Sequence, residues 1–487
     1  MKISLYIHIP FCVRKCLYCD FNSGPYDNKV RSSYVEALTK ELVGRACELS
    51  EYEVISIFFG GGTPSILEVE AFSRIMDTIH KNYNLSDDCE ITMEVNPGTV
   101  GKTEKKLSGF KEAGINRISI GLQSANDDEL KHLGRIHTRA DFEQTYKLAH
   151  EAGINNVNVD IMTAIPGQTM DSYIETLRYV TALNPPPQHI SAYSLIIEEG
   201  TPYYDIYGDK ESESEESKMY GLHNAKTLTV SDCCEFQKEG QSESEHHDYE
   251  YMRLKKESVS DKLQKITLPD EDTEREMYDA TRKLLHENGY ERYEISNYSK
   301  PGFESRHNSV YWERGNYYGF GVGASSLIEN VRFKNNDNIF EYIADPLDEN
   351  KAIDKEILTK KEQMEEFMFL GLRMTKGISI KVFENYFGIE FPTEYIDVIE
   401  KYMKMGYMEA VPASESKKVV NINSNESSDC NEEENAGSSK LLHPEKEYES
   451  DLAKFEKYIV FRQKYDRIML TNKGIDISNY ILSEFIF

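Results

Sequence analysis

Residues 6–21 read YIHIPFCVRKCLYCDF, and Cys12, Cys16 and Cys19 in this stretch follow the spacing C-x3-C-x2-C. Three thiolates this close together can reach one metal centre without filling it. A [4Fe–4S] cube takes four ligands, so three cysteines leave one iron open for a small molecule. The alternative is a zinc site with His8 as fourth ligand, but structural zinc sites are usually two spaced pairs. The spacing therefore predicts an iron–sulfur cluster on the three cysteines.

Composition limits the class of protein. The chain has 487 residues, 39% hydrophobic and 29% charged, as expected for a soluble globular protein of about two domains. No apolar run approaches the roughly 20 residues that span a bilayer, and the N-terminus has no signal-peptide pattern. The remaining cysteines are scattered, which fits a reducing compartment, and we expect a cytoplasmic protein. A net charge of −28 argues against nucleic acid as a partner.

Short apolar runs alternate with amphipathic stretches in the N-terminal part of the chain. The runs lie at 4–9, 54–59, 90–95, 117–122, 156–162 and 189–195, with helices expected at 33–49 and 69–82 among others. The segment EAGINRISI from Glu112 recurs as EAGINNVNV from Glu151, and each copy reads as a helix end, a glycine stop and a strand. These features predict an α/β fold, a partial (βα)6 TIM-like barrel. A doubly wound open sheet remains the alternative.

Two acidic, Ser/Glu-rich segments, 209–265 and 413–451, interrupt this pattern and are predicted to be disordered insertions. The pairs Cys233/Cys234 and His246/His247 in the first segment read as incidental. The core is therefore predicted at 1–208 and 266–345, with a helix at 278–288 and a strand-like run at 290–298. Helices at 359–375, 379–387 and 392–405, then a hairpin-like piece at 465–474, predict a small winged-helix-like domain over 356–487, suited to protein contact.

Polar residues gather at the predicted strand ends. Gly60, Gly61, Gly62 and Thr63 follow the second predicted strand, where glycines let a ligand approach the backbone. Three later strand ends carry Glu94, Gln123 and Asp160, and Arg135 follows the Gln123 strand. In a barrel such residues converge on one mouth. A carboxylate facing ribose hydroxyls and an arginine facing an amino-acid carboxylate would suit a nucleoside ligand, whereas helix caps or buried ion pairs are the plainer interpretation of each residue alone.

The segment RHNSVYW, residues 306–312, contains the only tryptophan of the chain. A histidine close to an aromatic pair offers an imidazole ligand beside flat apolar surfaces, which suits an iron macrocycle. From the residues alone, an ordinary histidine near a turn is the simpler interpretation of His307.

Taken together, these motifs resemble the radical S-adenosylmethionine (SAM) superfamily and, within it, the HemW family of heme chaperones, relatives of the oxygen-independent coproporphyrinogen III oxidase HemN. The resemblance covers the chain except the two insertions. It implies a [4Fe–4S] cluster on Cys12, Cys16 and Cys19, and heme on His307. It also implies a SAM site formed by Tyr6, Tyr18, Gly61, Gly62, Thr63, Glu94, Gln123, Arg135 and Asp160.

The resemblance also separates the two related families. The oxidase carries a further cysteine two residues after the third, where this chain has Phe21, as in HemW. A HemW-like protein is expected to pass heme to a recipient, such as a membrane respiratory enzyme. Two alternatives stay open: radical decarboxylation of coproporphyrinogen III, and a non-enzymatic interaction protein with a structural cluster.

Overall fold

The computed structural model describes residues 1–208, 266–348, 353–412 and 445–486. The predicted insertion 209–265, with its Cys233/Cys234 and His246/His247 pairs, lies outside the described residues, as do residues 413–444. Helix α17, Glu445–Lys464, begins before the predicted end of the second insertion at 451, so that boundary falls inside a helix.

The chain forms two compact units. The first comprises Met1–Arg292, Ser296–His307 and Asn316–Lys355, and the second comprises Tyr293–Ile295, Asn308–Gly315 and Glu356–Phe487. The predicted core stretch 266–345 is therefore shared, because two of its short segments fold with the C-terminal unit. In the described parts of the chain, no helix is long and apolar enough to cross a membrane.

The first unit begins with six repeated strand–helix steps. In chain order its elements up to the first insertion are β1 (Lys2–Ile9), α1 (Asn28–Arg45), β2 (Glu53–Gly61), the short 3-10 turn Pro64–Ile66, α2 (Val69–Asn82), β3 (Asn84–Val95), α3 (Lys105–Glu112), β4 (Arg117–Gln123), α4 (Asp127–His132), α5 (Arg139–Glu151), β5 (Asn156–Thr163), α6 (Met170–Thr181), β6 (His189–Ser194) and α7 (Pro202–Tyr207).

After the first insertion the described chain adds further strands to the same sheet, with helices between them. These are α10 (Glu271–Glu287), β7 (Glu291–Arg292), β8 (Asn297–Ser299), α11 (Arg306–Trp312), β9 (Tyr317–Phe320), β10 (Ser325–Ile328), β11 (Val331–Lys334), α12 (Ile339–Ala344) and β12 (Ile353–Ile357).

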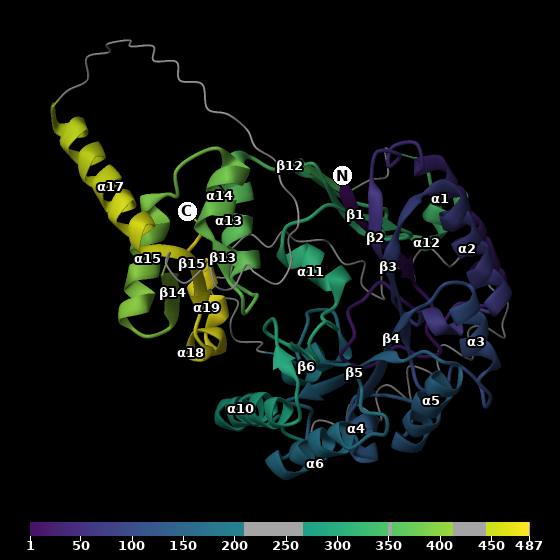
Figure 1. The fold of residues 1–487 in the computed structure, drawn as a ribbon. Coiled ribbons are helices and arrows are strands. Elements are labelled where there is room, and N and C mark those ends of the chain that lie inside the picture. Colours follow the sequence, from purple (N-terminus) through teal and green to yellow (C-terminus); the bar gives the residue numbers. More distant parts are fainter. Residues whose placement is uncertain (209–265, 349–352, 413–444, 487) are drawn as a thin grey trace. The chain divides into compact units, whose positions relative to one another are not determined.

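Strands β1 to β6 are parallel and lie in the sheet in their chain order (Figure 1). This order confirms the predicted TIM-like barrel and excludes the doubly wound sheet, in which the strand order reverses. β8 joins antiparallel to β6 and β9 joins parallel to β1, so both edges of the six-stranded part are extended. The carboxyl ends of the six strands therefore share one edge, where the predicted site residues lie.

The barrel strands have one apolar face and one polar face. On β4, Ile118, Ile120 and Leu122 join the hydrophobic core, whereas Arg117 and Ser119 alternate with them and are also buried. Because side chains of a strand alternate between faces, these polar residues point away from the covering helices. Along these strands, which were predicted from short apolar runs, apolar and polar residues thus alternate. The polar face also includes Ser4, Ser56, Thr92, Asn158 and His189.

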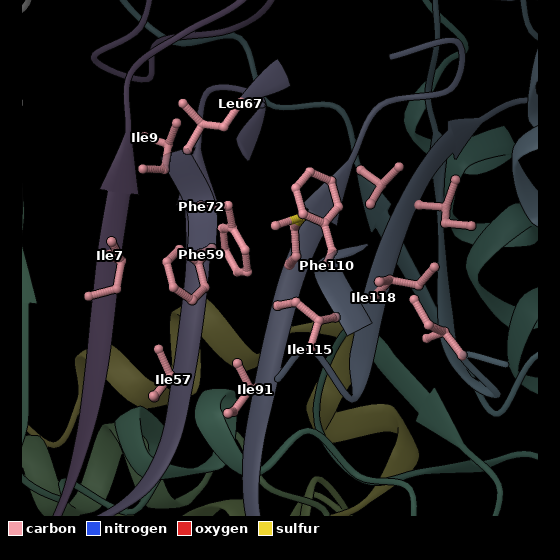
Figure 2. Packing of buried hydrophobic residues seen from close by; sticks show 14 of the residues in the cluster. Ile7, Ile9, Ile57, Phe59, Leu67, Phe72, Ile91, Phe110, Ile115 and Ile118 are labelled. Carbon is pink, nitrogen blue, oxygen red and sulfur yellow. The ribbon is translucent and has the colours of Figure 1, made fainter. Parts of the chain in front are cut away.

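The apolar face packs against the helices. Figure 2 shows Phe59 of β2 beside Phe72 of α2, with Phe110 of α3 next to Phe72. The ring centroids of Phe59 and Phe72 are 4.8 Å apart, and those of Phe72 and Phe110 are 5.1 Å apart. Burying each such side chain stabilises the fold by about 1.5–3 kcal/mol. This packing holds β2 and β3 in place, and with them the strand ends that carry the site.

The internal repeat forms two helix-to-strand turns of the same kind. Helices α3 and α5 each end just before a glycine with positive φ, Gly114 at 120° and Gly153 at 78°. In each copy the backbone N–H of the following isoleucine, Ile115 or Ile154, bonds back to the last helical turn. This C-cap needs a left-handed residue, which glycine adopts most easily, so the predicted glycine stops are confirmed.

The second unit is a small domain of helices and a three-stranded sheet. Its described elements are α13 (Lys360–Gly371), β13 (Ile378–Ser379), α14 (Ile380–Phe387), α15 (Thr393–Lys404), β14 (Met408–Pro412), α17, β15 (Tyr465–Leu470), α18 (Asn472–Asp476) and α19 (Ser478–Ser483). The three predicted helices are present, and the sheet order β13-β15-β14 gives the winged-helix-like arrangement. The predicted hairpin at 465–474 is a single central strand followed by a helix.

The strand-like run predicted at 290–298 is also different in the structure. β7 and β8 are separated by residues 293–296, which leave the sheet. Tyr293 accepts a hydrogen bond from the backbone N–H of Thr375, and Glu294 forms a bridge with Met374. These tertiary contacts, which lie within the second unit, thus override the local β pattern at 293–296.

Candidate functional site

The three cysteines lie on the loop between β1 and α1. Cys12 is buried, whereas Cys16 and Cys19 are half-buried. The Cys12 backbone N–H donates to Gly24 O at 2.9 Å, and the Gly24 N–H donates to Pro10 O at 2.9 Å, so the loop closes on itself. Burial, the largest effect, and the neighbouring thiols raise the pKa of Cys19 to about 11. A positive centre bound there would be needed to hold this thiol as thiolate.

The hydrogen bonds of His8 argue against the alternative zinc site, in which His8 would be the fourth ligand. His8 Nε2 lies 2.8 Å from Asn22 O and must donate to it, so Nδ1 accepts from the Tyr6 hydroxyl at 3.1 Å. Both ring nitrogens of His8 are therefore engaged. Thiolates on a [4Fe–4S] cube bind separate irons, so they need not converge on one point.

A chain of hydrogen bonds joins two of the thiols across the strand ends. Thr63 Oγ1 donates to Cys12 Sγ at 3.8 Å and accepts from Asn96 Nδ2 at 2.6 Å. Asn96 Oδ1 accepts from Arg135 Nη2 at 2.8 Å, and Arg135 Nη1 donates to Cys16 Sγ at 3.6 Å. Donors aimed at sulfur stabilise thiolates and orient ligands of a metal centre. The donor set thus fits an iron–sulfur cluster.

The glycine run is crowded by the protein's own chain. A Cβ on Gly61, where φ is 105°, would come within 2.4 Å of His8 Nδ1. A Cβ on Gly62 would meet Ile9 O at 2.8 Å, and the Gly62 N–H already donates to that oxygen at 2.9 Å. Glycine is therefore required here so that β2 can run close beside the end of β1. This packing brings Thr63 next to Cys12.

Two carboxyl groups face the inside of the barrel below the cysteine loop. Glu94 accepts the Gly61 backbone N–H at 3.1 Å, and Asp160 accepts from Ser119 at 2.9 Å and Asn158 at 2.7 Å. Burial, and after it the charge of Asp160, raise the pKa of Glu94 to about 8. Burial also raises the pKa of Asp160. Two desolvated acids close together are typical of a ligand site. A ligand bound there would supply hydroxyl groups or positive charge to these carboxyl groups.

We expect glutamine at Glu94 to stabilise the ligand-free protein at alkaline pH. The folded pKa, about 8, lies above the ordinary value of 4.5, so the wild-type carboxyl lowers the free energy of unfolding as pH rises between these values. Glutamine does not titrate. Relative to the wild type, the variant should therefore gain roughly 4 kcal/mol between pH 4 and pH 8.5. Urea unfolding at both pH values measures this. Exposed Glu175→Gln is the control, and a pH-independent difference for Glu94→Gln would contradict the prediction.

Gln123 ends β4 in a strained conformation. Its φ is 68°, in the left-handed region, and its Oε1 accepts from the Tyr193 hydroxyl at 2.9 Å. Ala164, just after β5, also has a positive φ of 59°. Non-glycine residues in this region cost free energy and cluster at ligand sites. The turn after β4 directs the Gln123 side chain back into the barrel, where the tyrosine holds it.

Two tyrosines frame the cysteine loop. Tyr6 lies on β1, and its hydroxyl donates to His8. Burial, the largest effect, raises the pKa of Tyr18, which lies close to Cys16 and Cys19, and its ring centroid is 6.4 Å from that of Tyr203. The Tyr18 phenol therefore stays neutral at physiological pH and can donate a hydrogen bond.

His307 lies inside the first unit, at the start of α11. Its side chain is 1% exposed, and its Nδ1 is 3.0 Å from Ser56 Oγ. Its ring stacks on Phe58 at 5.1 Å, and the Tyr6 ring lies 6.5 Å away. Burial, and after it the charge of Arg117, lower the pKa of His307 to about 3. The imidazole is therefore neutral at physiological pH, the form that ligates metals.

Comparison with known proteins identifies the family of the chain. Residues 6–180 match the radical SAM superfamily, and residues 358–410 match the HemN C-terminal domain. Heme chaperone HemW of Bacillus subtilis is 33% identical over 406 residues, which are 82% of this chain and 91% of the relative. HemW of Escherichia coli is 35% identical over 327 residues, 67% of this chain and 70% of the relative. The chain belongs to the HemW family.

The fold comparison extends beyond the HemW family. The solved structure of coproporphyrinogen III oxidase (HemN) from Escherichia coli covers 99% of this chain and 90% of its own, with a TM-score of 0.66 and 18% identity. At this identity the likeness concerns the fold alone. It agrees with the parallel barrel and the C-terminal domain described above.

Several residues around the candidate site were not singled out from the sequence. Asn96 links Thr63 to Arg135, and Tyr193 holds Gln123. Phe58, whose ring stacks on that of His307, was not singled out either. In the second unit, the Arg373 guanidinium lies over the Trp312 ring, with Cζ 4.3 Å from the ring centroid. Polar residues on alternate positions of the strands were the available signal, because they mark a polar barrel interior.

Proposed function

We propose that this protein is a heme chaperone, which binds heme, holds it and passes it to a recipient protein. The observation that carries the proposal is the similarity to curated HemW proteins over most of their length, for example 87% of the Lactococcus lactis relative at 32% identity. Those relatives are heme chaperones by name. The neutral imidazole of His307 beside two aromatic rings gives the same conclusion a chemical basis.

The cysteine loop would hold a [4Fe–4S] cluster on Cys12, Cys16 and Cys19. Thr63 and Arg135 would orient the sulfur atoms of Cys12 and Cys16. When bound, the cluster would supply an open iron that the methionine part of SAM can chelate. Residues proposed to contact SAM are Tyr6, Tyr18, Gly61, Gly62, Thr63, Glu94, Gln123, Arg135 and Asp160.

For SAM, the chain offers groups of the required kinds. Glu94 and Asp160 would accept hydrogen bonds from ribose hydroxyls, and the Arg135 guanidinium would face a carboxylate. Backbone groups next to Gly61 would face the amino group. The arrangement of these residues on neighbouring strand ends supports one shared ligand.

The related oxidase activity is the less favoured alternative. The position two residues after Cys19 is Phe21, which is 57% exposed and cannot ligate iron. We therefore propose that the protein carries heme and does not decarboxylate coproporphyrinogen III. We also propose that it acts in the cytoplasm. Its recipient would be a heme-accepting protein such as a membrane respiratory enzyme.

Hemin titration tests the proposal directly. Anaerobically purified protein should bind about one hemin per chain, with a shift of the Soret band, whether or not the cluster is present. Mixing the loaded protein with excess apomyoglobin should then transfer the heme, because a chaperone must release its cargo. A protein that binds no hemin, or never releases it, would refute the proposed function.

A further inference from the structure

Arg117, the first residue of β4, is a buried cation inside the barrel. It is 2% exposed, and it alternates on the strand with core residues such as Ile118, so its side chain lies on the polar inner face. A buried charge is costly unless a counter-charge or hydrogen bonds compensate it. The question is therefore what compensates this guanidinium.

Within the described residues, the Arg117 side chain has no hydrogen-bond or ion-pair partner, and its Nε is buried without one. The acidic groups nearby are engaged elsewhere. Glu90 accepts the backbone N–H groups of Arg306 and His307, both at 3.2 Å. Asp160 accepts from Ser119 and Asn158. Burial raises the pKa of Asp160 and the charge of Arg117 acts to lower it, but no acid of the described residues forms a hydrogen bond or ion pair with the guanidinium.

The strand neighbours of Arg117 have unpaired polar atoms too. Thr92 on β3 and Asn156 on β5 stand directly beside it in the sheet register. The Thr92 Oγ1 atom and the Asn156 Oδ1 atom are buried and have no partner among the described residues. A carboxylate accepts hydrogen bonds from both a guanidinium and a hydroxyl, and an amide can turn to donate as well. Arg117 Nε and Thr92 Oγ1 can thus both donate to one acceptor, and Asn156 can join them by presenting its amide nitrogen in place of the unpaired Oδ1.

We infer that Arg117, with Thr92 and Asn156, forms a binding site for a carboxylate, namely a propionate group of the bound tetrapyrrole. This inference rests on the proposed heme function. SAM is a poorer candidate for the source of this carboxylate. The residues predicted to contact SAM lie toward the carboxyl ends of the strands, whereas Arg117 is the first residue of β4. Arg117 and Gln123 are six residues apart on β4, about 20 Å in an extended strand.

His307 lies near the same end of the barrel. It is held by Ser56, which pairs with Glu90 in the sheet register, and Thr92 is two residues further along β3. The charge of Arg117 contributes to lowering the pKa of His307, after burial, so the guanidinium and the imidazole share one interior. An iron ligand and a propionate site would then hold one macrocycle from two sides.

The test compares hemin with hemin dimethyl ester, whose propionates cannot bear charge. Wild-type protein should bind hemin about 10- to 100-fold more tightly than the ester, the range expected for a hydrogen-bonded charged pair. Arg117→Met should lose this preference and keep its affinity for the ester. Arg178→Gln, which removes an exposed arginine of α6, should keep the preference.

A second readout needs no ligand. Because Arg117 is unpaired in the ligand-free protein, Arg117→Met should unfold at the same or a higher temperature than the wild type. Lower thermal stability of Arg117→Met would mean a structural role and overturn the inference. Equal binding of hemin and ester by the wild type, or a preference retained in Arg117→Met, would overturn it as well. Failure of the wild type to bind either compound would instead refute the heme function itself.

Discussion

Serine at Cys16 is expected to leave the protein without its cluster. Serine places a hard hydroxyl where iron requires a soft thiolate, and two remaining cysteines cannot hold a cube that has only three protein ligands. Cys16 is also the thiol that Arg135 Nη1 contacts at 3.6 Å, so its loss leaves a guanidinium N–H without its acceptor. After anaerobic reconstitution, wild-type protein should contain about four irons per chain and absorb broadly in the visible range. The variant should contain almost none.

The matched control is Cys47→Ser, which changes an exposed cysteine after α1 and should reconstitute fully. Thermal unfolding of both apo variants would check that the fold is intact. A Cys16→Ser protein with full iron content would place the cluster elsewhere. A wild-type protein that is colourless and binds zinc stably would contradict the account of the cysteine loop.

Alanine at His307 should weaken hemin binding more than any other single change near α11. The imidazole is neutral and buried, and its ring is held between Ser56 and Phe58. Losing an outer partner of a metal typically costs 10- to 100-fold in affinity, so losing the ligand should cost roughly 100-fold or more. Spectral titration with hemin measures this loss, and the Soret shift of the wild type should survive removal of the cluster.

Two further variants separate ligation from packing. Phe58→Ala should also loosen hemin binding, but by less than His307→Ala, because it removes the ring that stacks on the imidazole and no ligand. His80→Ala, at an exposed histidine of α2, should have no effect. If His307→Ala bound hemin with unchanged spectrum and affinity, another residue would ligate the iron and the histidine would be structural.

Much of the fold follows from local sequence signals. The glycines at 114 and 153 and the runs before and after them specify helix ends and strand starts, which need only nearby residues. The six parallel strands follow from their repetition. The bend at 293–296 could not be predicted, because it depends on the Tyr293–Thr375 hydrogen bond between residues far apart in the chain.

The residues of the candidate site also fall into two groups, those recognisable from the local sequence and those whose roles depend on tertiary contacts. The cysteines and glycines are recognisable from the sequence because their function depends on their spacing along the chain. Asn96, Tyr193 and Arg117 are not, since their roles depend on which strand lies next to which and on register. The Tyr193–Gln123 bond joins residues 70 positions apart. A period-two polar pattern on the strands was visible, but it acquires meaning only once the sheet closes around a polar interior.

The most direct test of the central claim is anaerobic incubation of reconstituted protein with coproporphyrinogen III, SAM and a reductant, followed by product analysis. In parallel, the same preparation is titrated with hemin. A heme chaperone should bind about one hemin per chain and form no protoporphyrinogen IX. Accumulation of protoporphyrinogen IX over multiple turnovers would show that the protein is a decarboxylating radical enzyme, and would contradict the account.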